Sequence, residues 1–113
     1  MNNCLFCKIV DGSVPAEVVY RDKSVVAFKD INPQAPVHLI VIPTKHLSGV
    51  SDSSVTEGDT LNRLFKVVAD LAERNGCEKG YRVVSNCGED GGQTVPHLHF
   101  HLLGKRHLNW PPG

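Results

Sequence analysis

The sequence predicts one domain in which a single long helix packs on a sheet, and three observations predict it. A chain of 113 residues is long enough to bury one hydrophobic core and too short for two. Short runs rich in β-branched and aromatic residues, bounded by turn residues, are typical of strands. Between residues 59 and 75, apolar residues recur instead at the spacing of a helix. We therefore expect residues 1–113 to form a single domain.

The first half of the chain predicts a hairpin, a loop and a buried strand. Residues 18–21 and 25–29 are the two strands of the hairpin, separated by three polar residues. The stretch DINPQAP that follows contains two prolines, whose fixed φ and missing N–H exclude a helix or a central strand. Residues 38–42 are almost continuously apolar and end at Pro43, which is typical of a buried strand.

The second half predicts an exposed connection and then the long helix. Residues 48–58 are mainly polar. Ser54 or Thr56 is available as the N-cap, and Gly76 follows the predicted last residue. One face of the helix is expected to pack on the sheet through the apolar residues Leu61, Leu64, Phe65, Val68, Leu71 and Ala72.

Three histidines alternate with apolar residues in the stretch PHLHFHLLG, after a predicted strand at 81–86 and a glycine-rich turn at 88–92. On a strand, successive side chains point to opposite faces. The histidines are therefore expected to share one face, while the apolar residues between them point to the core. Such a row can be a polar strand face, a metal site or a nucleophilic site. The two sets are His97, His99 and His101, and Leu98, Phe100 and Leu102.

Charge and hydropathy exclude several partners. The formal net charge is zero, with 12 basic and 12 acidic residues, so no strong field favours a nucleic acid or an anionic membrane surface. No segment approaches the roughly 20 apolar residues that span a bilayer, and the N-terminus lacks the pattern of an export signal. The sequence thus predicts a cytoplasmic protein that binds neither nucleic acid nor membrane, with nucleotides a better expectation than polynucleotides.

The four cysteines are expected to be thiols or metal ligands rather than disulfides, because no export signal is present. Cys4 and Cys7 form a C-x-x-C pair, whereas Cys77 and Cys87 are single. The pair is the common half of a zinc site, although a redox function for it stays open.

The chain resembles the nucleotide-binding branch of the histidine triad superfamily. The similarity rests on the stretch HLHFHLL and on four further segments: FCKIVDGSVPAEVVYRD, AFKDINPQAPVHLIVIP, KGYRVVSNCGEDGGQTV and the terminal NWPPG. It implies an α+β fold in which an antiparallel sheet packs with one long helix and a short N-terminal helix. It also implies a homodimer whose two sheets join across helix and strand.

The resemblance further implies an enzyme that cleaves the P–N bond of purine nucleoside phosphoramidates through a nucleotidyl-histidine intermediate. His99 would be the nucleophile, since a ring whose Nδ1–H is held by a backbone carbonyl presents its Nε2 lone pair. His101 would donate to the phosphate or the leaving amine. His38 and Thr94 match further catalytic positions, although Thr94 stands where the family commonly has serine. Pro96 replaces a common tyrosine.

The nucleotide-binding positions are carried over in the same way. Asp30 matches the acid that accepts hydrogen bonds from the ribose hydroxyls. Asn86, Gly92 and Thr94 match positions around the phosphate, together with His99 and His101. The resemblance places four apolar residues around the base and one aromatic residue toward the partner subunit's site: Phe6, Ile9, Phe28, Ile31 and Trp110.

Some bacterial relatives use a C-x-x-C pair, a histidine in a P-x-K-H segment and the first triad histidine to bind zinc. The corresponding residues are Cys4, Cys7, His46 and His97. The resemblance therefore implies one structural zinc ion per subunit, because four protein ligands leave no open position for catalysis. Three other functions remain open: dinucleoside polyphosphate hydrolysis, nucleotidyl transfer, and non-enzymatic nucleotide binding as a scaffold or sensor.

Overall fold

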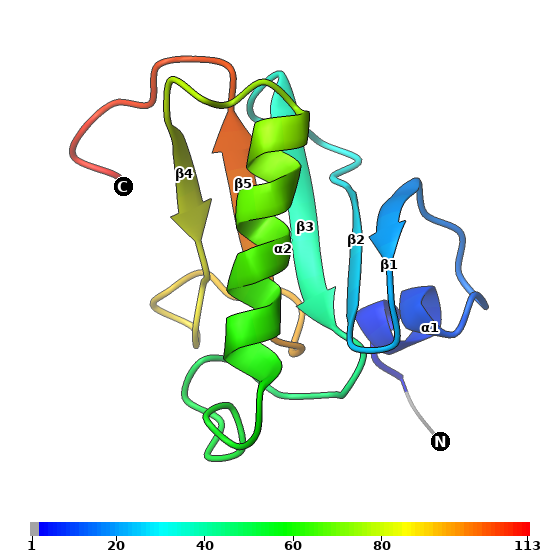
Figure 1. Cartoon of the computed structure of the whole chain (residues 1–113). Coiled ribbons are helices and arrows are strands. Elements are labelled where there is room, and N and C mark those ends of the chain that lie inside the picture. Colours follow the sequence, from blue (N-terminus) through cyan, green and yellow to red (C-terminus); the bar gives the residue numbers. More distant parts are fainter. Residues whose placement is uncertain (1–2) are drawn as a thin grey trace.

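The computed structural model describes residues 3–113 as a five-stranded antiparallel sheet with two helices (Figure 1). Along the sheet the strand order is β1-β2-β3-β5-β4. Strand β5 therefore inserts between β3 and β4, and β4 forms one edge. The α+β class predicted for this chain is confirmed. The strands are β1 (Val18–Arg21), β2 (Val25–Lys29), β3 (Val37–Pro43), β4 (Tyr81–Val84) and β5 (Phe100–Gly104).

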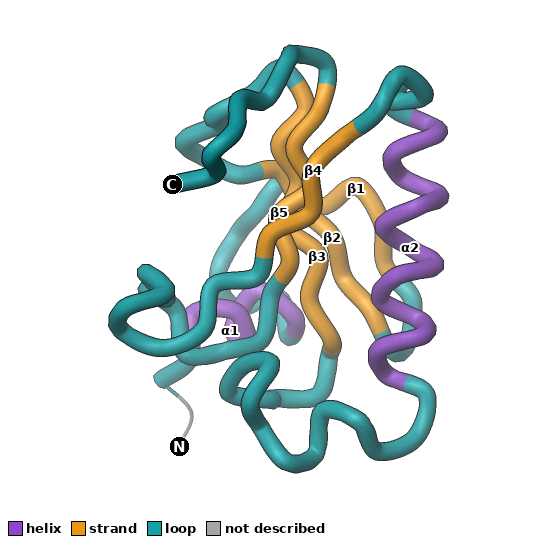
Figure 2. Tube along the Cα trace, turned by 90° about the vertical axis from the view of Figure 1, so that its left-hand side faces the viewer, coloured by secondary structure: helices purple, strands orange, loops and turns teal. Residues whose placement is uncertain are grey.

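The two helices lie on opposite faces of the sheet (Figure 2). Helix α2 (Thr60–Arg74) crosses one face, and the short helix α1 (Leu5–Val10) lies on the other. Each helix is amphipathic and buries its apolar stripe, so the sheet carries one hydrophobic layer on each side. The layer under α2 includes Leu64, Leu71 and Leu102, and the layer under α1 includes Phe6 and Ile40.

The predicted hairpin and buried strand are confirmed, with β1 and β2 paired antiparallel and β3 buried along almost all its length. The glycine-rich turn is also present, since Gln93 N–H donates to Gly88 O at 3.0 Å. Gly88 and Gly92 have φ of 74° and 76°, a conformation that suits glycine.

The predicted strand through the triad is displaced. Strand β5 begins at Phe100, so only His101 lies within it. Before Phe100 the backbone makes isolated contacts instead of a ladder, because His97 N–H donates to Val95 O and Leu98 N–H donates to Leu47 O. The alternation still holds. His97 and His99 contact Phe6 in the α1 layer, whereas the apolar residues Leu98, Phe100 and Leu102 pack in the α2 layer.

The predicted strand 81–86 is shorter than expected and ends at Val84. The hydroxyl of Ser85 donates to His99 O at 2.8 Å, so the chain there makes a side-chain contact to the triad segment. The predicted N-cap of α2 was wrong, because Asp59 and not Ser54 or Thr56 is the N-cap residue, and it makes no side-chain capping bond. Gly76 directly follows the C-cap residue Asn75, as predicted, with φ of 76°. Phe65 was also placed wrongly. Its side chain is 49% exposed and packs at the rim against Phe100.

Over residues 3–113, neither helix has the length and apolar character that crossing a membrane requires.

Candidate active site and metal site

The sheet register places the histidines on the face that carries α1. In the ladder, Ile40 pairs with His101 and His38 pairs with Leu103. Side chains two residues apart on a strand share a face, so His38, Ile40 and His101 project to the same side. His99 follows from the segment just before β5, and its ring centroid lies 5.2 Å from that of His101. Two pairs of residues from distant parts of the sequence thus lie on one face.

His99 is held in a single orientation. Its side chain is buried, and its Nδ1 lies 2.7 Å from the backbone oxygen of His97. A carbonyl oxygen only accepts, so Nδ1 carries the proton and donates. The neutral ring therefore has its lone pair on Nε2. The ring of Phe6 packs edge-on against it at 5.0 Å and limits its rotation.

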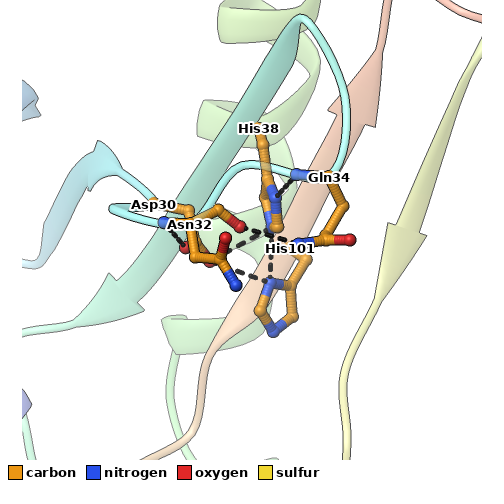
Figure 3. A network of polar contacts seen from close by, with 5 residues as sticks. All are labelled: Asp30, Asn32, Gln34, His38 and His101. Atoms are coloured by element: carbon orange, nitrogen blue, oxygen red, sulfur yellow. Dashed lines mark hydrogen bonds and ion pairs between the residues drawn. The ribbon is translucent and has the colours of Figure 1, made fainter.

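His101 belongs to a chain of polar contacts that starts in the loop before β3 (Figure 3). Gln34 N–H donates to His38 Nδ1 at 3.0 Å, so the proton of neutral His38 is on Nε2. That Nε2 lies 2.9 Å from His101 Nδ1 and 3.3 Å from Asp30 Oδ2. His101 Nδ1 therefore accepts, and the proton of neutral His101 is on Nε2. Asp30 is fixed in turn by Asn32 N–H, which donates to Oδ1 at 2.8 Å.

Burial keeps these imidazoles uncharged at neutral pH. It is the main cause that lowers the pKa of His101 to about 4; the nearby His99 and His38 lower it further, and Asp30 opposes the shift. Burial also lowers the pKa of His38, again against Asp30. Both rings thus act as neutral groups, each with one N–H donor and one lone pair.

The Nε2 atoms of His99 and His101 are not completely enclosed by protein. Each ring makes its hydrogen bond through Nδ1. No buried side-chain nitrogen or oxygen of residues 3–113 lacks a hydrogen-bond partner, so an Nε2 without one must reach the surface. The site thus presents a lone pair from His99 beside an N–H donor from His101. The first can attack a phosphorus atom while the second donates a hydrogen bond to the phosphate group.

A second cluster lies at the other end of the triad. Cys4, Cys7, His46 and His97 each offer one ligand atom, and these four atoms lie within 4.8 Å of one another. His46 Nδ1 and His97 Nδ1 are 3.2 Å apart, and the Cys7 Sγ lies 3.3 Å from the first and 3.5 Å from the second. Cys4 Sγ is 3.3 Å from His97 Nδ1.

These distances fit a tetrahedral metal site. With Zn–S near ~2.3 Å and Zn–N near ~2.0 Å, the ligand atoms of such a site lie roughly 3.3 to 3.8 Å apart. His97 is fully buried, and its Nε2–H donates to Pro43 O at 3.0 Å, which leaves the Nδ1 lone pair facing the thiols. Two thiolates and two imidazoles favour zinc over oxygen-binding metals. His97 thus belongs to the metal cluster, and its carbonyl orients His99.

The remaining predicted residues differ in how far they are exposed. Phe6, Ile9 and Phe28 are buried in the layer under α1, with the rings of Phe6 and Phe28 5.4 Å apart. In contrast, Ile31 is fully exposed and Trp110 is 81% exposed. Of the residues predicted to lie around the phosphate, Gly92 and Thr94 are exposed and Asn86 is half-buried, with Asn86 Nδ2 donating to Gly91 O at 2.6 Å.

Three groups that fix the site were not anticipated. They are the backbone N–H of Gln34, the backbone oxygen of Pro43 and the hydroxyl of Ser85. Two of them are main-chain atoms, which every residue type carries, so only the fold identifies them. The DINPQAP loop was a partial signal, because its prolines indicate a fixed loop beside the following strand.

Comparison with known proteins identifies the family of this chain. The HIT domain family model matches residues 11–108. The chain belongs to the HIT family. A HIT family hydrolase from Legionella pneumophila is 48% identical and superposes with a TM-score of 0.94, over 98% of this chain and all of that one. A 14 kDa zinc-binding protein from Zea mays is 46% identical over 96% of this chain and 87% of its own length.

A more distant member of the HIT family, a histidine triad nucleotide-binding protein from Candida albicans, is 30% identical with a TM-score of 0.86. The match covers 96% of this chain and 83% of that one. The three proteins span organisms as different as a bacterium, a plant and a yeast, and nearly the whole chain aligns with each.

Proposed function

We propose that the protein is a hydrolase of purine nucleoside phosphoramidates that releases an amine and a nucleoside monophosphate. The observation that carries the proposal is the hydrogen bond from His99 Nδ1 to the backbone oxygen of His97, because it leaves the lone pair of the neutral ring on Nε2, which is not completely enclosed. The similarity to a HIT family hydrolase and to a histidine triad nucleotide-binding protein supports the reaction class.

In the first step, His99 Nε2 attacks phosphorus and forms a P–N bond to the ring. The bond from phosphorus to the substrate amine breaks, and the amine leaves with a proton. An amine is a poor leaving group unless it is protonated, so a donor beside it accelerates this step. The amine takes this proton from solvent, because neutral His101 could release its own only by becoming an imidazolate anion. His101 Nε2–H instead donates a hydrogen bond to a phosphate oxygen, and Asp30 and His38 hold its ring in place.

In the second step, water attacks phosphorus and the bond to His99 Nε2 breaks. A proton of the attacking water passes to solvent, and the cationic His99 ring returns to its neutral form, while His101 keeps its Nε2–H throughout. Thr94 contributes its hydroxyl on the loop that leads into the triad. Asn86 and Gly92 line the phosphate, where a glycine allows close approach of a backbone N–H.

The nucleoside would bind on the same face. Asp30 accepts the ribose hydroxyls, and the purine lies beside the exposed Ile31, at the edge of the apolar layer that contains Phe6, Ile9 and Phe28. The full exposure of Ile31 supports a role in contacting a ligand, since a large aliphatic side chain gains from being covered.

We also propose that Cys4, Cys7, His46 and His97 hold one structural zinc ion per subunit. The similarity to a zinc-binding protein of Zea mays supports this assignment. When bound, the ion would cross-link the segment before α1 to the loop after β3 and to the start of the triad. It leaves the chemistry to His99 and His101, because four protein ligands occupy all its positions.

A homodimer through α2 and β4 is part of the proposal. Strand β4 is an edge strand, and an exposed edge is usually covered or paired. Phe65 on α2 and Tyr81 on β4 are 49% and 43% exposed. Both are large aromatic side chains, which favour burial at a subunit interface. Trp110, on the exposed C-terminal segment, would reach toward the partner subunit's site.

The test is to incubate the purified protein with adenosine 5′-phosphoramidate and measure adenosine monophosphate and ammonia. The proposal expects equal amounts of both products, and none from His99→Ala, while the variant keeps the wild-type fold by circular dichroism. Tight binding of adenosine monophosphate without turnover by the wild type would instead indicate a nucleotide-binding protein. If the protein hydrolyses a dinucleoside polyphosphate but no phosphoramidate, its substrates are dinucleoside polyphosphates instead.

A further inference from the structure

A cavity of about 580 Å³ lies away from the triad, where the chain leaves α2 and enters β4 and where it leaves β5. None of the residues around it belongs to the triad, the Asp30 contacts or the metal cluster. Its volume is in the range of cavities that hold small molecules. The side chains around it include Glu78, Lys79, Arg82, Lys105, Arg106 and His107.

The cavity is strongly cationic in a chain of zero net charge. Four basic side chains and one carboxylate give it a charge of +3 when His107 is neutral. Within residues 3–113, none of Lys79, Arg82, Lys105 and Arg106 forms an ion pair, since the ion pairs involve other residues. Four like charges that are not neutralised locally raise the free energy of the empty cavity, and an anion would lower it.

Two of the cations are held in place by neutral partners. The Arg82 guanidinium donates to the backbone oxygens of Leu108 and Asn109 at 3.2 and 2.8 Å. Arg106 donates from Nε to Gln34 O and from Nη1 to His107 O, both at 2.9 Å. Carbonyl oxygens orient a guanidinium without cancelling its charge. Both groups are therefore already ordered, which lowers the entropic cost of binding an anion.

Lys105 is placed by an unfavourable backbone conformation. It is the one non-glycine residue of the described chain with positive φ, at 68°. Such a conformation costs about 1 kcal/mol or more for a residue with a Cβ, and it is often found where a side chain must point to a ligand. Its ammonium lies against Gly76, where an added Cβ would be 3.4 Å from Nζ. Gly76 and Lys105 both line the cavity, so this third cation lies at its wall.

We propose that this cavity is a binding site for a small, multiply charged anion of the oligophosphate class. A net charge of +3 matches two or more linked phosphates better than a single one. Arginine and lysine together suit this class, because a guanidinium binds two phosphate oxygens at once and an ammonium adds a compact charge. His107, which lines the same cavity and has no place in the proposed reaction, offers a further N–H donor.

The test uses inorganic tripolyphosphate as the probe and the full-length protein saturated with adenosine monophosphate, so that the triad site is filled. Titration followed by ¹⁵N–¹H NMR is expected to shift the amides of Gly76, Gly80 and Lys105 and to leave that of Gly92 unchanged. Increasing salt should weaken the binding, because ion pairing with phosphates is screened.

Two variants and one matched control decide the outcome. Lys79→Ala and Lys105→Gly are each expected to weaken binding roughly tenfold, as is usual for loss of a charged hydrogen bond. Glycine at 105 suits the left-handed backbone, so this variant should fold at least as well as the wild type. Lys66→Ala removes an exposed lysine from α2 and should change nothing.

Equal binding by the wild type and both cavity variants would overturn the proposal. So would an equal loss in the Lys66 variant, since that would indicate attraction to the whole surface. Amide shifts confined to Gly92 and the triad would place the probe in the proposed nucleotide site instead. None of these results depends on turnover, so the cavity and the hydrolase proposal can fail separately.

Discussion

The Nε2 atom of His38 lies 2.9 Å from Nδ1 of His101, with Gln34 N–H bonded to the far side of the His38 ring. This relationship fixes the protonation of both rings in their neutral state. His38 donates, His101 accepts, and the proton of His101 is left on the nitrogen that faces solvent. A loop amide before β3 thus determines which nitrogen of a histidine on β5 can act as a donor.

The first prediction is that His38→Asn lowers turnover of adenosine 5′-phosphoramidate by roughly ten- to a hundredfold, because His101 loses the partner that selects its tautomer. The loss should fall on kcat more than on KM. Gln34→Ala is the matched control. It keeps the backbone N–H that bonds His38, so its turnover should stay near that of the wild type, and an equal loss in both variants would contradict the tautomer argument.

The second prediction concerns stability against pH. The pKa of His101 falls from 6.5 to about 4 on folding, so between these values the unfolded chain binds more protons than the folded one. Neutral His101 therefore makes its full contribution to the free energy of unfolding above pH 6.5. This contribution decreases as the pH falls and is fully lost below about pH 4. The loss is on the order of 3 kcal/mol in the free energy of unfolding.

Urea unfolding at pH 7 and pH 5 measures this loss. His101→Asn cannot titrate, so its free energy of unfolding should fall less between the two pH values than that of the wild type. His107→Asn is the control, since His107 is exposed and should keep the wild-type slope. If the free energy of unfolding falls equally between pH 7 and pH 5 in the wild type and in His101→Asn, His101 is not the buried neutral group described above.

The third prediction concerns the metal cluster. Cys4→Ser should abolish stoichiometric zinc and lower the melting temperature, because the segment before α1 loses its cross-link to His46 and His97. Cys87→Ser is the control, since Cys87 lies outside the cluster. Metal analysis of both proteins decides the matter. Full zinc content in the Cys4 variant would place the ion elsewhere.

The fourth prediction concerns assembly. Phe65→Glu puts a charge on the exposed face of α2. It should convert the dimer to a monomer, because burying an unpaired charge in an interface strongly destabilises the complex. Sedimentation at several concentrations measures the change. Glu57→Lys, in the exposed connection before α2, also alters surface charge and should leave the dimer intact. A wild-type protein that is monomeric throughout would contradict the proposed assembly.

Much of the fold could be predicted because its signals are local. The spacing of Leu64, Val68 and Leu71 predicts a helix on its own, and alternation separates the histidines from Leu98, Phe100 and Leu102. The burial of Phe65 was predicted wrongly because the spacing of apolar residues shows which face of a helix is buried but not how wide that face is. The start of β5 was mistaken because His97 and Leu98 bond to Val95 and Leu47, and no local pattern reports such contacts.

The metal cluster and the chain from Gln34 to His101 required more than the residues alone. Cys4 and His97 are 93 positions apart, and their proximity follows from how α1 packs on the sheet. The prediction that Cys4 and His97 bind the same metal ion came from the resemblance to a family. The two tautomers depend on backbone atoms of Gln34 and His97, which carry no signature in the sequence.

The central claim is that His99 Nε2 forms the bond to phosphorus. The most direct measurement is a single turnover with adenosine 5′-phosphoramidate, quenched in base to preserve a phosphorus–histidine bond, followed by peptide mass spectrometry. We predict one adenylyl group, attached to His99 and absent from His99→Ala. An adenylyl group on another residue, or full hydrolysis by His99→Ala, would contradict the account.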